Sequence, residues 1–429
     1  MQELINSGKF SARQIGIIVI CLLLNVSDGF DVLSWAYTAD RVGNFLDLTA
    51  TQLGMVGSAA LLGMTIGALF LAPLSDLYGR RPLILTSVTA ISLAMFATAY
   101  VNDFTLLLVL RFIAGAGVGA ILAGLAAIAC EYTPDKYKSF AVVVITLGYP
   151  FGASFAGYVA AVLLPNYDWP SMYFFGGSVN VVLLVGVWFL LPESLHYLAV
   201  KQPKNALQRA NKILSSMQKQ TITELPVIPE GPKAGYVENL LALLAPVHRT
   251  KTLLLWSTFF FGFMCLYFLL IWIPKMLVDA GFTEQQGLIA GAAFNLGAVV
   301  GVLLIGFLAI KYSLTKMISL FMLLSSVGMV IYALAPQDIQ VLIALIFVIG
   351  IFQQGGFTGL YAAAAKLYPA DIRATGIGWA IGLGRFGAVA APSAAGMLFQ
   401  AGTSMQVAFY IFAVPAALAG IFAYLTKVD

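Results

Sequence analysis

Residues 72–81 read Ala72-Pro73-Leu74-Ser75-Asp76-Leu77-Tyr78-Gly79-Arg80-Arg81, a short charged turn in an otherwise apolar part of the chain. One apolar run, 52–72, leads into this turn, and another, 83–101, follows it. A helix of about 20 apolar residues spans the hydrocarbon core of a bilayer. The turn is therefore expected to join two membrane-spanning helices at a membrane surface.

Apolar runs of the same kind continue along the whole chain. Of the 429 residues, 60% are hydrophobic and only 10% are charged, which is too little charge to cover a soluble protein of this size. Twelve candidate spans can be delimited: 14–37, 52–72, 83–101, 104–127, 139–163, 172–191, 252–273, 285–309, 315–335, 338–362, 374–396 and 404–426. The expected fold is an all-α membrane protein with twelve transmembrane helices.

The basic residues indicate how these helices are oriented. With the N-terminus inside, 19 of the 23 lysines and arginines lie on the cytoplasmic side, whereas only Arg41 and Lys275 lie outside. Short loops rich in Lys and Arg remain in the cytoplasm. Both termini are therefore expected to be cytoplasmic.

A long polar stretch, 192–250, divides the spans into six and six. We therefore expect an N-terminal half (1–191), a cytoplasmic linker (192–250) and a C-terminal half (251–429). The linker begins with a basic run that includes Lys201, Lys204, Arg209, Lys212 and Lys219. Such a run predicts an amphipathic helix lying on the anionic membrane surface.

The two halves also repeat each other in sequence. At a constant offset of 235, residues 131–157 match 366–392, with aligned pairs that include Lys138 and Arg373, Phe151 and Phe386, and Gly152 and Gly387. Chance matches between helices rich in small residues are the alternative explanation. Two related halves are the expected build of an alternating-access transporter, with its binding site between them near the midplane.

Two carboxylates lie inside the first span, in the sequence Asp28-Gly29-Phe30-Asp31. A charged side chain in a bilayer must be solvated, paired or protonated, and residues three apart share one face of a helix. We expect Asp28 and Asp31 to take up a proton on one side of the membrane and release it on the other. The alternative is a purely structural ion pair.

Two arginines, Arg111 and Arg385, also lie inside spans. At 1.5 Å per residue, Asp31 lies about 9 Å and Arg111 about 10 Å below the outer membrane edge, so the two are expected at one level. Arg385 lies roughly 18 Å from the cytoplasmic end, near the midplane. The second half has no acid at that depth, so Arg385 requires either an acid of the first span or an anionic substrate.

Four further side chains are expected at the substrate site: Trp35, Tyr149, Asn295 and Gln353. Trp35 lies near the face of the two acids, and Tyr149 lies in a span that is rich in glycine and proline. Packing in a bent helix is the alternative role for Tyr149. For Asn295 and Gln353 the alternative is a hydrogen bond from helix to helix.

Charged residues at helix ends are the candidate gates. The opening turn resembles the loop signature of the major facilitator superfamily, Gly-x-x-x-Asp-Arg-x-Gly-Arg-Arg, although Ala72 and Leu77 depart from it. This resemblance implies a gating role for Asp76, Arg80 and Arg81. Glu131 and Arg373 occupy corresponding places in the two halves and are expected to cross-link the cytoplasmic side when it shuts. Solvated helix-end charges are the alternative.

Several motifs together resemble the aromatic acid/proton symporter family of that superfamily. They are Asp28-Gly29-Phe30-Asp31, Arg111-Phe112, Glu131-Tyr132-Thr133-Pro134, the stretch from Tyr368 to Trp379, and Gly384-Arg385-Phe386-Gly387. The resemblance implies proton-driven uptake of benzoate-type aromatic acids, or of muconate in some members. It also implies that five residues are important for function: Asp28, Asp31, Glu131, Arg373 and Arg385. Lys311 departs from the pattern, because family members commonly keep an acid in that loop.

The expected function is the import of an organic carboxylate, first of all an aromatic acid, together with protons across a bacterial inner membrane. Arg385, helped by Arg111, would hold the substrate carboxylate by charge-assisted hydrogen bonds. The coupling ion is a proton, and no cofactor is expected. The protein is expected to act as a monomer in lipid, without a nucleic-acid partner, since its net charge is only +4.

Three alternatives remain open. The first is a proton symporter for an aliphatic di-acid or another metabolite, and the second is a drug/proton antiporter. The third is a membrane-embedded enzyme or sensor, which the sequence disfavours. Its three cysteines lie in separate apolar runs and its two histidines are far apart, so neither a disulfide framework nor a catalytic metal centre is expected.

Overall fold

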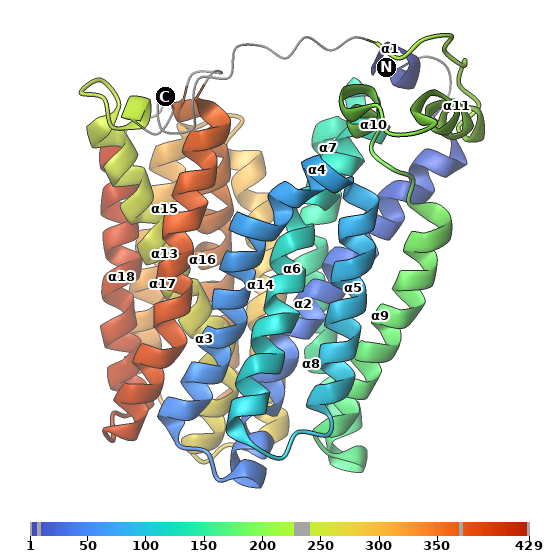
Figure 1. Ribbon diagram of the computed structural model, residues 1–429. Helices are drawn as coiled ribbons and strands as arrows, with labels where there is room; N and C mark the ends of the chain where they lie inside the picture. The colour runs from blue at the N-terminus through green and yellow to red at the C-terminus, as the bar shows by residue number, and fades with distance from the viewer. Residues whose placement is uncertain (1, 7–9, 227–240, 369–371, 427–429) are drawn as a thin grey trace.

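The computed structural model describes residues 2–6, 10–226, 241–368 and 372–426, and this part of the chain is built of helices without strands. Eleven of the described helices are long and apolar enough to cross a membrane. The twelfth expected span, 374–396, is formed as α17, a 28-residue helix that is not among the eleven. The all-α membrane fold is thereby confirmed (Figure 1).

The long helices form two groups. The N-terminal half consists of α2 (Ala12–Leu46), α3 (Ala50–Ile66), α5 (Arg80–Thr98), α6 (Phe104–Tyr132), α7 (Lys138–Thr146), α8 (Gly148–Tyr167) and α9 (Pro170–Leu190). The C-terminal half consists of α13 (Arg249–Asp279), α14 (Glu284–Leu308), α15 (Leu314–Leu334), α16 (Ile339–Leu367), α17 (Arg373–Gln400) and α18 (Met405–Thr426). The expected fifth span is divided between α7 and α8.

Short helices connect and cover these elements. They are α1 (Gln2–Asn6), η1 (Gly67–Leu71), η2 (Ala72–Leu74), α4 (Ser75–Tyr78), η3 (Asp135–Tyr137), α10 (Leu195–Lys201) and α11 (Ala206–Ser216). Both termini lie at one end of the bundle, at the top of Figure 1, which we call the terminal end; the opposite end is the far end. The charged turn at 72–81 also lies at the terminal end.

The internal repeat is visible in how the helices begin and pack. Asp103 caps the start of α6 and Asp338 caps the start of α16, each accepting two backbone N–H groups, and the two acids keep the offset of 235. Glycines at the same offset mark close helix crossings in both halves. A Cβ at Gly152 would lie 1.9 Å from the Val26 carbonyl oxygen, and one at Gly387 would lie 2.1 Å from that of Phe260.

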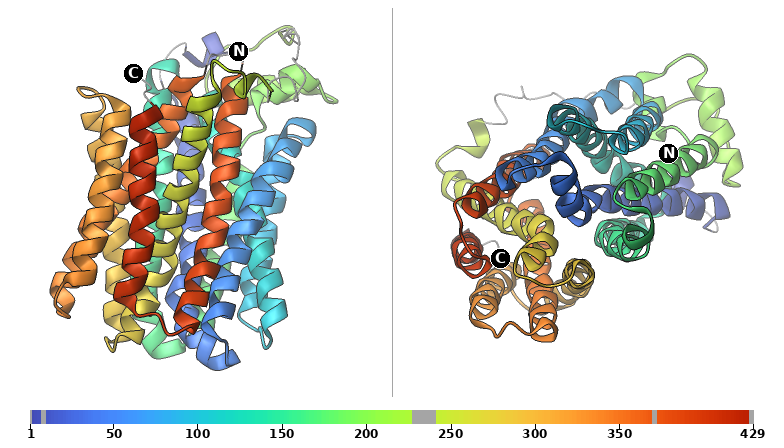
Figure 2. Two further views of the ribbon diagram at one scale, coloured as in Figure 1. Left: turned by 90° about the vertical axis from the view of Figure 1, so that its left-hand side faces the viewer. Right: turned by 90° about the horizontal axis from the view of Figure 1, so that it is seen from below.

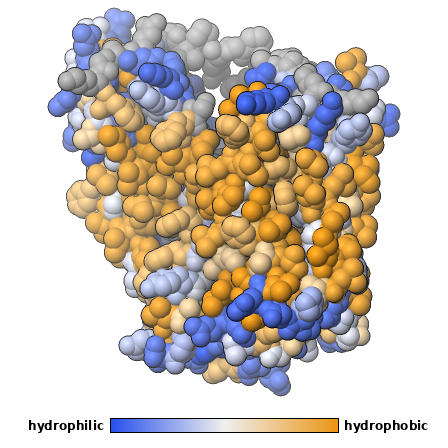
Figure 3. Space-filling view, turned by 180° about the vertical axis from the view of Figure 1, so that it is seen from behind, coloured by the Kyte–Doolittle hydropathy of each residue, from blue (hydrophilic) through white to orange (hydrophobic). Residues whose placement is uncertain are grey.

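The halves pack most extensively through α3 against α17, α8 against α14, and α2 against α13. Seen along the bundle in Figure 2, the two groups of helices lie side by side. A broad hydrophobic band separates two hydrophilic ends, as a membrane-spanning surface requires (Figure 3). Figure 3 also shows a notch between the halves at the terminal end.

The linker helix differs from its expected role. The basic amphipathic run forms α11, but its apolar residues Ala206, Ala210 and Leu214 are buried within the protein. That face packs on protein, so these three residues do not enter the lipid, and the contact of α11 with the membrane surface stays a prediction. The rest of the expected linker includes residues 227–240, and the motif after Tyr368 includes 369–371; both segments lie outside the described residues.

Candidate functional site

Asp31 and Arg111 form a buried ion pair inside the N-terminal half. Arg111 Nη1 lies 3.6 Å from Asp31 Oδ1, and the two side chains are 2% and 3% exposed. The guanidinium carbon also lies 5.0 Å from the centre of the Tyr173 ring. The contact agrees with the common depth estimated for the two residues from the sequence. Because a buried charge is costly without a partner, this pair leaves Arg111 already neutralised within its own half.

Asp28 lies one turn before Asp31 on α2 and lacks such a cation. It is 3% exposed, and its Oδ2 atom has no hydrogen-bond partner among the described residues. Its neighbour Gly29 touches α8 directly, since a Cβ there would lie 2.1 Å from the Tyr149 carbonyl oxygen. This close crossing places the backbone of Tyr149 against Gly29, the residue that follows Asp28 on α2.

Arg385 is the other buried cation, and it has no acidic partner in the described chain. It is 6% exposed on α17, its Nε atom makes no hydrogen bond within the described structure, and its guanidinium carbon lies 6.0 Å from the centre of the Phe263 ring. Tyr149 and Tyr361 both lie within its electrostatic range. An arginine in these surroundings requires an anion, and none of the described residues supplies one in direct contact.

Aromatic rings of the C-terminal half surround Arg385. Phe263 packs against Phe357 with ring centres 4.5 Å apart and stacks on Tyr267 at 6.0 Å. Tyr267 also interacts with Tyr149 of the opposite half. Sequence reasoning missed Tyr267 and Tyr361, although a tyrosine hydroxyl in the middle of an apolar span is a signal that could have identified both.

The other expected substrate ligands are placed differently. Trp35 is 2% exposed, and its indole nitrogen has no hydrogen-bond partner within the described residues. Asn295 donates to the Gly291 carbonyl of its own helix at 2.9 Å and lies beside Tyr37. Both side chains are buried.

Gln353 is fully buried and bonded to its own half. It donates to the Gly262 carbonyl at 3.2 Å and accepts from the Ser325 hydroxyl at 2.8 Å. These bonds join α16 to α13 and α15, as the alternative role of joining helix to helix requires. The amide oxygen and the amide nitrogen thus each have a partner within the C-terminal half.

Two of the expected gating residues, Arg80 and Glu131, pair with each other at the terminal end within the N-terminal half. Arg80 forms an ion pair with Glu131, whose other oxygen accepts from Ser194 Oγ at 2.7 Å. Glu193, which the sequence reading did not single out as a site residue, accepts the backbone N–H groups of Arg80 and Arg81 at 2.9 and 3.2 Å. This cluster ties the start of α5 to α6 and to the chain after α9.

The side chains of the remaining gate candidates form no ion pair with this cluster among the described residues. Asp76 is exposed and makes no ion pair with any described residue. Arg81 donates to the Trp188 carbonyl at 2.6 Å. Arg373 is exposed and donates to the Tyr368 carbonyl at 3.1 Å, so the expected link between Glu131 and Arg373 is not formed in this conformation.

The far end carries ion pairs that do cross between the halves. Arg41 of α2 makes two hydrogen bonds of 2.7 Å to the Glu284 carboxylate of α14. Lys275 of α13 lies 2.9 Å from Asp40. The sequence reading used Arg41 and Lys275 only as markers of orientation. Their contacts show that the far end is closed.

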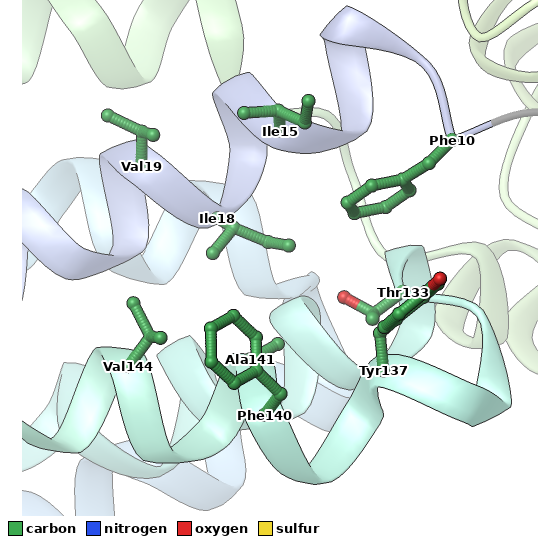
Figure 4. Close-up of a pocket in the computed structure, with 9 residues that line it drawn as sticks. All are labelled: Phe10, Ile15, Ile18, Val19, Thr133, Tyr137, Phe140, Ala141 and Val144. Atoms are coloured by element: carbon green, nitrogen blue, oxygen red, sulfur yellow. The ribbon is translucent and has the colours of Figure 1, made fainter.

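The groove in Figure 4 is a separate feature on the N-terminal half. It lies between the start of α2 and α7, with a volume of about 320 Å³. Its lining is apolar except for Thr133 and the hydroxyl of Tyr137. No charged side chain lines it, so it offers nothing to bind an organic anion, and the candidate site remains the region around Asp28, Tyr149 and Arg385.

Comparison with known proteins gives relatives that share this architecture. The family model of the Major Facilitator Superfamily matches residues 19–294 and 281–429. The 4-hydroxybenzoate transporter PcaK of Pseudomonas putida is 31% identical over 98% of this chain and 94% of its own length. The 3-(3-hydroxy-phenyl)propionate transporter of Escherichia coli (strain K12) is 31% identical over 92% of this chain and 89% of its own.

One further relative and one solved structure agree with these matches. The gallate transporter of Pseudomonas putida is 28% identical over 98% of this chain and 93% of its own length. Among solved structures, the crystal structure of a D-xylose-proton symporter superposes with a TM-score of 0.76 at 16% identity, covering 97% of this chain and 99% of that one. At that identity the structural likeness shows the fold alone.

Proposed function

Because the chain belongs to the major facilitator superfamily and, within it, to the aromatic acid transporters, we propose that it imports an aromatic carboxylate together with protons. The observation that carries this proposal is Arg385, a buried guanidinium without an acidic partner in the described chain. A substrate carboxylate would complete its charge and form short, charge-assisted hydrogen bonds with it. The relatives named for 4-hydroxybenzoate, gallate and hydroxyphenylpropionate transport support an aromatic acid as that substrate.

The rings beside Arg385 suit the remainder of such a molecule. The Phe263 ring centre lies 6.0 Å from the guanidinium carbon, and the Tyr267 ring stacks on Phe263 with ring centres 6.0 Å apart. Aromatic pairs stack or meet edge to face at centre distances of about 4.5 to 7 Å. Hydroxyl groups of Tyr149, Tyr267 and Tyr361 provide polar contacts for a carboxylate or a ring hydroxyl. An aliphatic di-acid would use the arginine but not the rings.

The proton sites in this proposal are the two acids of α2. Asp31 already has Arg111 as its counter-ion, so Asp28, which lacks a cation, is the member that gains and loses the proton. Its carboxylate and Arg385 both lie within electrostatic range of the Tyr149 hydroxyl. Protonation of Asp28 removes a negative charge from the neighbourhood in which a substrate anion must bind, and Coulomb repulsion between like charges is thereby relieved.

Alternating access follows from the two ends of the molecule. We propose that residues 1–191 and 251–429 move as two units joined by the linker 192–250, with Glu131 and Arg373 approaching each other when the terminal end shuts. The distribution of basic residues supports a cytoplasmic terminal end in a bacterial inner membrane. The conformation described here then faces the cytoplasm. The protein would act as a monomer in lipid and need no cofactor.

Reconstituted uptake tests the proposal. Purified protein in liposomes should accumulate labelled 4-hydroxybenzoate against its gradient only when a pH gradient, acidic outside, is imposed. Unlabelled gallate and benzoate should compete, whereas muconate competing equally well would favour an aliphatic di-acid as substrate. Export driven by the same gradient would instead indicate an antiporter and contradict the proposal.

Variants of Arg385 test the site itself. Arg385→Ala should weaken substrate binding by about thirtyfold or more, since truncating one partner of a buried charge pair costs about 2 to 5 kcal/mol. Arg385→Lys keeps the charge but loses the planar fork, so it should be intermediate. Binding by isothermal titration calorimetry checks both, and unchanged affinity in Arg385→Ala would exclude the proposed site.

A further inference from the structure

Four aromatic rings lie next to Arg385, and we call them the ring cluster: Phe259 and Phe263 of α13, with Phe357 and Tyr361 of α16. Phe263 packs against Phe357 with ring centres 4.5 Å apart, and Phe357 meets Tyr361 edge to face at 5.7 Å. Phe259 contacts the other three rings, at 5.5 Å from Tyr361 and 6.3 Å from the remaining two. Each ring therefore has at least two ring neighbours, and their packing fixes its position.

Arg385 and Tyr361 lie at opposite edges of the ring cluster. The guanidinium carbon lies 6.0 Å from the centre of Phe263, whereas the ring contacts of Tyr361 are with Phe259 and Phe357. At 1.5 Å per residue, Arg385 lies about 18 Å inside the terminal end and Tyr361 about 9 Å inside it. A ligand that binds Arg385 and extends along the ring cluster toward the terminal end therefore reaches Tyr361.

Tyr361 is the accessible member of the ring cluster. It is 38% exposed, whereas the three phenylalanines are at most 4% exposed. Its ring packs on Phe259 of α13, and a Cβ at Gly384 of α17 would lie 2.7 Å from the Phe259 Cβ. The halves contact each other through α13 and α17, so Tyr361 lies on the inner side of its half. It borders the space between the halves, which opens at the terminal end (Figure 3).

The Tyr361 hydroxyl is free to bind a ligand. It makes no hydrogen bond to any other residue that the structure describes. Its closest ring neighbours are phenylalanines, so the packing of the ring cluster uses the ring of Tyr361 and not its hydroxyl. Tyr332 of the same half differs, because it is 1% exposed and its hydroxyl lies 3.7 Å from Met405 Sδ.

Tyr267 is the other hydroxyl next to the ring cluster, and it lies deeper. It stacks on Phe263 with ring centres 6.0 Å apart and is 6% exposed. On α13 it lies about 27 Å inside the terminal end, beyond the level of Arg385. The far end is closed by ion pairs between the halves. The open space therefore lies on the side of Arg385 that Tyr361 borders.

We propose that Tyr361 recognises a hydroxyl group on the substrate ring, at the position opposite the carboxylate that Arg385 binds. This inference rests on the proposed function and deepens it, since it names a para-hydroxylated benzoate as the preferred substrate. With its carboxylate on Arg385, the substrate lies against the ring cluster, and its para position points away from the guanidinium toward Tyr361. The two hydroxyls form one neutral hydrogen bond in which either can donate. This bond selects for the ring substituent and leaves the binding of the carboxylate unchanged.

The test is the Kd of benzoate, 3-hydroxybenzoate and 4-hydroxybenzoate for the full-length protein in lipid nanodiscs, measured by isothermal titration calorimetry. Tyr361→Phe should weaken binding of 4-hydroxybenzoate by about two- to tenfold, the value of one neutral hydrogen bond. The other two ligands lack a para hydroxyl, so their Kd values should stay as in the wild type. Tyr332→Phe is the matched control and should leave all three values unchanged.

Removing the hydroxyl from the protein and from the ligand in turn completes a double-mutant cycle. The preference for 4-hydroxybenzoate over benzoate should fall in Tyr361→Phe by the same factor of about two to ten. Tyr267→Phe should leave this preference as in the wild type, because its hydroxyl lies on the other side of Arg385. Melting temperatures close to the wild-type value should show that each variant is folded.

Four outcomes would overturn the inference. Equal weakening of benzoate and 4-hydroxybenzoate in Tyr361→Phe would assign the hydroxyl to the carboxylate, and unchanged Kd values would show that it binds neither ligand. Equal weakening of the two hydroxybenzoates would exclude recognition of the para position. Loss of the preference in Tyr267→Phe alone would place the ring hydroxyl at the deeper tyrosine.

The proposed function is tested separately from this inference. It stands after any of these outcomes if the wild type accumulates an aromatic acid with a pH gradient and Arg385→Ala weakens binding of both benzoate and 4-hydroxybenzoate. If the wild type fails to accumulate such an acid, or if Arg385→Ala binds both ligands normally, the proposed function fails first.

Discussion

The two ends of the molecule use charged residues in opposite ways. At the far end, Arg41 and Lys275 bind acids of the opposite half, at 2.7 and 2.9 Å. At the terminal end, Arg80 binds Glu131 of its own half, and Arg373 is exposed. Ion pairs between acidic and basic side chains occur at both ends, so the presence of charge does not indicate which end is shut. What distinguishes the ends is whether the partners lie on the same rigid group of helices.

Packing shows the same difference between the ends. At the far end the halves approach until backbone meets backbone: a Cβ at Gly54 would lie 2.3 Å from the Pro392 carbonyl oxygen, and one at Gly396 would lie 2.5 Å from that of Ala50. Towards the terminal end the corresponding approach is loose, because a Cβ at Gly382 would meet Leu69 at 3.5 Å, an ordinary contact. The closed end is therefore held by shape as well as by charge.

Distances between paired spin labels can follow both ends independently. Tyr167 and Ala401 are exposed at the far end, on the N-terminal and C-terminal half respectively, and Tyr78 and Tyr312 are exposed at the terminal end. Each pair, converted to cysteines in a background without the native cysteines, reports one end. A far end that opens lengthens the first distance and shortens the second.

The largest effect is expected from a wedge at the far end. Gly54→Ala places a methyl group 2.3 Å from a carbonyl oxygen of the other half, and overpacking of this kind costs about 1 to 3 kcal/mol. The far end should open, so the Tyr167–Ala401 distance distribution should shift to longer values in most molecules. Gly382→Ala is the matched control and should leave both distributions as in the wild type. A closed far end in Gly54→Ala would show that this contact does not hold the halves together.

Reversing one charge should have the next largest effect. Arg41→Glu sets an acid against Glu284 of the other half and Asp168 of its own, both of which contact Arg41 at present. A repulsion of about 2 kcal/mol corresponds to a change of roughly thirtyfold in the ratio of open to closed far ends. The double variant Arg41→Glu with Glu284→Arg should restore most of the closed population. If the double variant remains as open as the single one, the pair does not act across the halves.

The sequence could predict those parts of the site that depend on depth along a helix. Asp31 and Arg111 were expected at one level, and they form an ion pair. Arg385 was expected near the midplane without an acid of its own half, and it has none within the described residues. Depth follows directly from residue number, because each residue advances a helix by 1.5 Å.

The sequence could not predict which side of a helix a residue faces, nor which distant segments of the chain contact each other. Gln353 has a suitable depth, but its side chain bonds to Ser325 inside the C-terminal half. Each residue turns a helix by about 100°, and α16 is apolar on most sides. The sequence therefore does not indicate which side of α16 faces the site. Tyr267 was hidden among 18 tyrosines. The partner of Lys275 lies 235 residues away at Asp40. Only the packing of α2 against α13 brings those two together.

The smallest effect, and the sharpest comparison, concerns the two acids on Lys275. Its ammonium lies 2.9 Å from Asp40 of the other half and 2.6 Å from Asp279 of its own helix. Asp40→Asn and Asp279→Asn each remove one carboxylate from the same lysine, and partly exposed pairs of this kind are worth about 0.2 to 1 kcal/mol. Asp40→Asn should therefore raise the ratio of open to closed far ends by roughly 1.4- to fivefold in the label distances, and the effect should fall at high salt. Asp279→Asn should leave that fraction unchanged or lower it, since the lysine is then free to bind Asp40 more fully. Equal shifts in the two variants would mean that the lysine contributes only to local charge, and that the far end is held by Arg41 and by backbone packing alone.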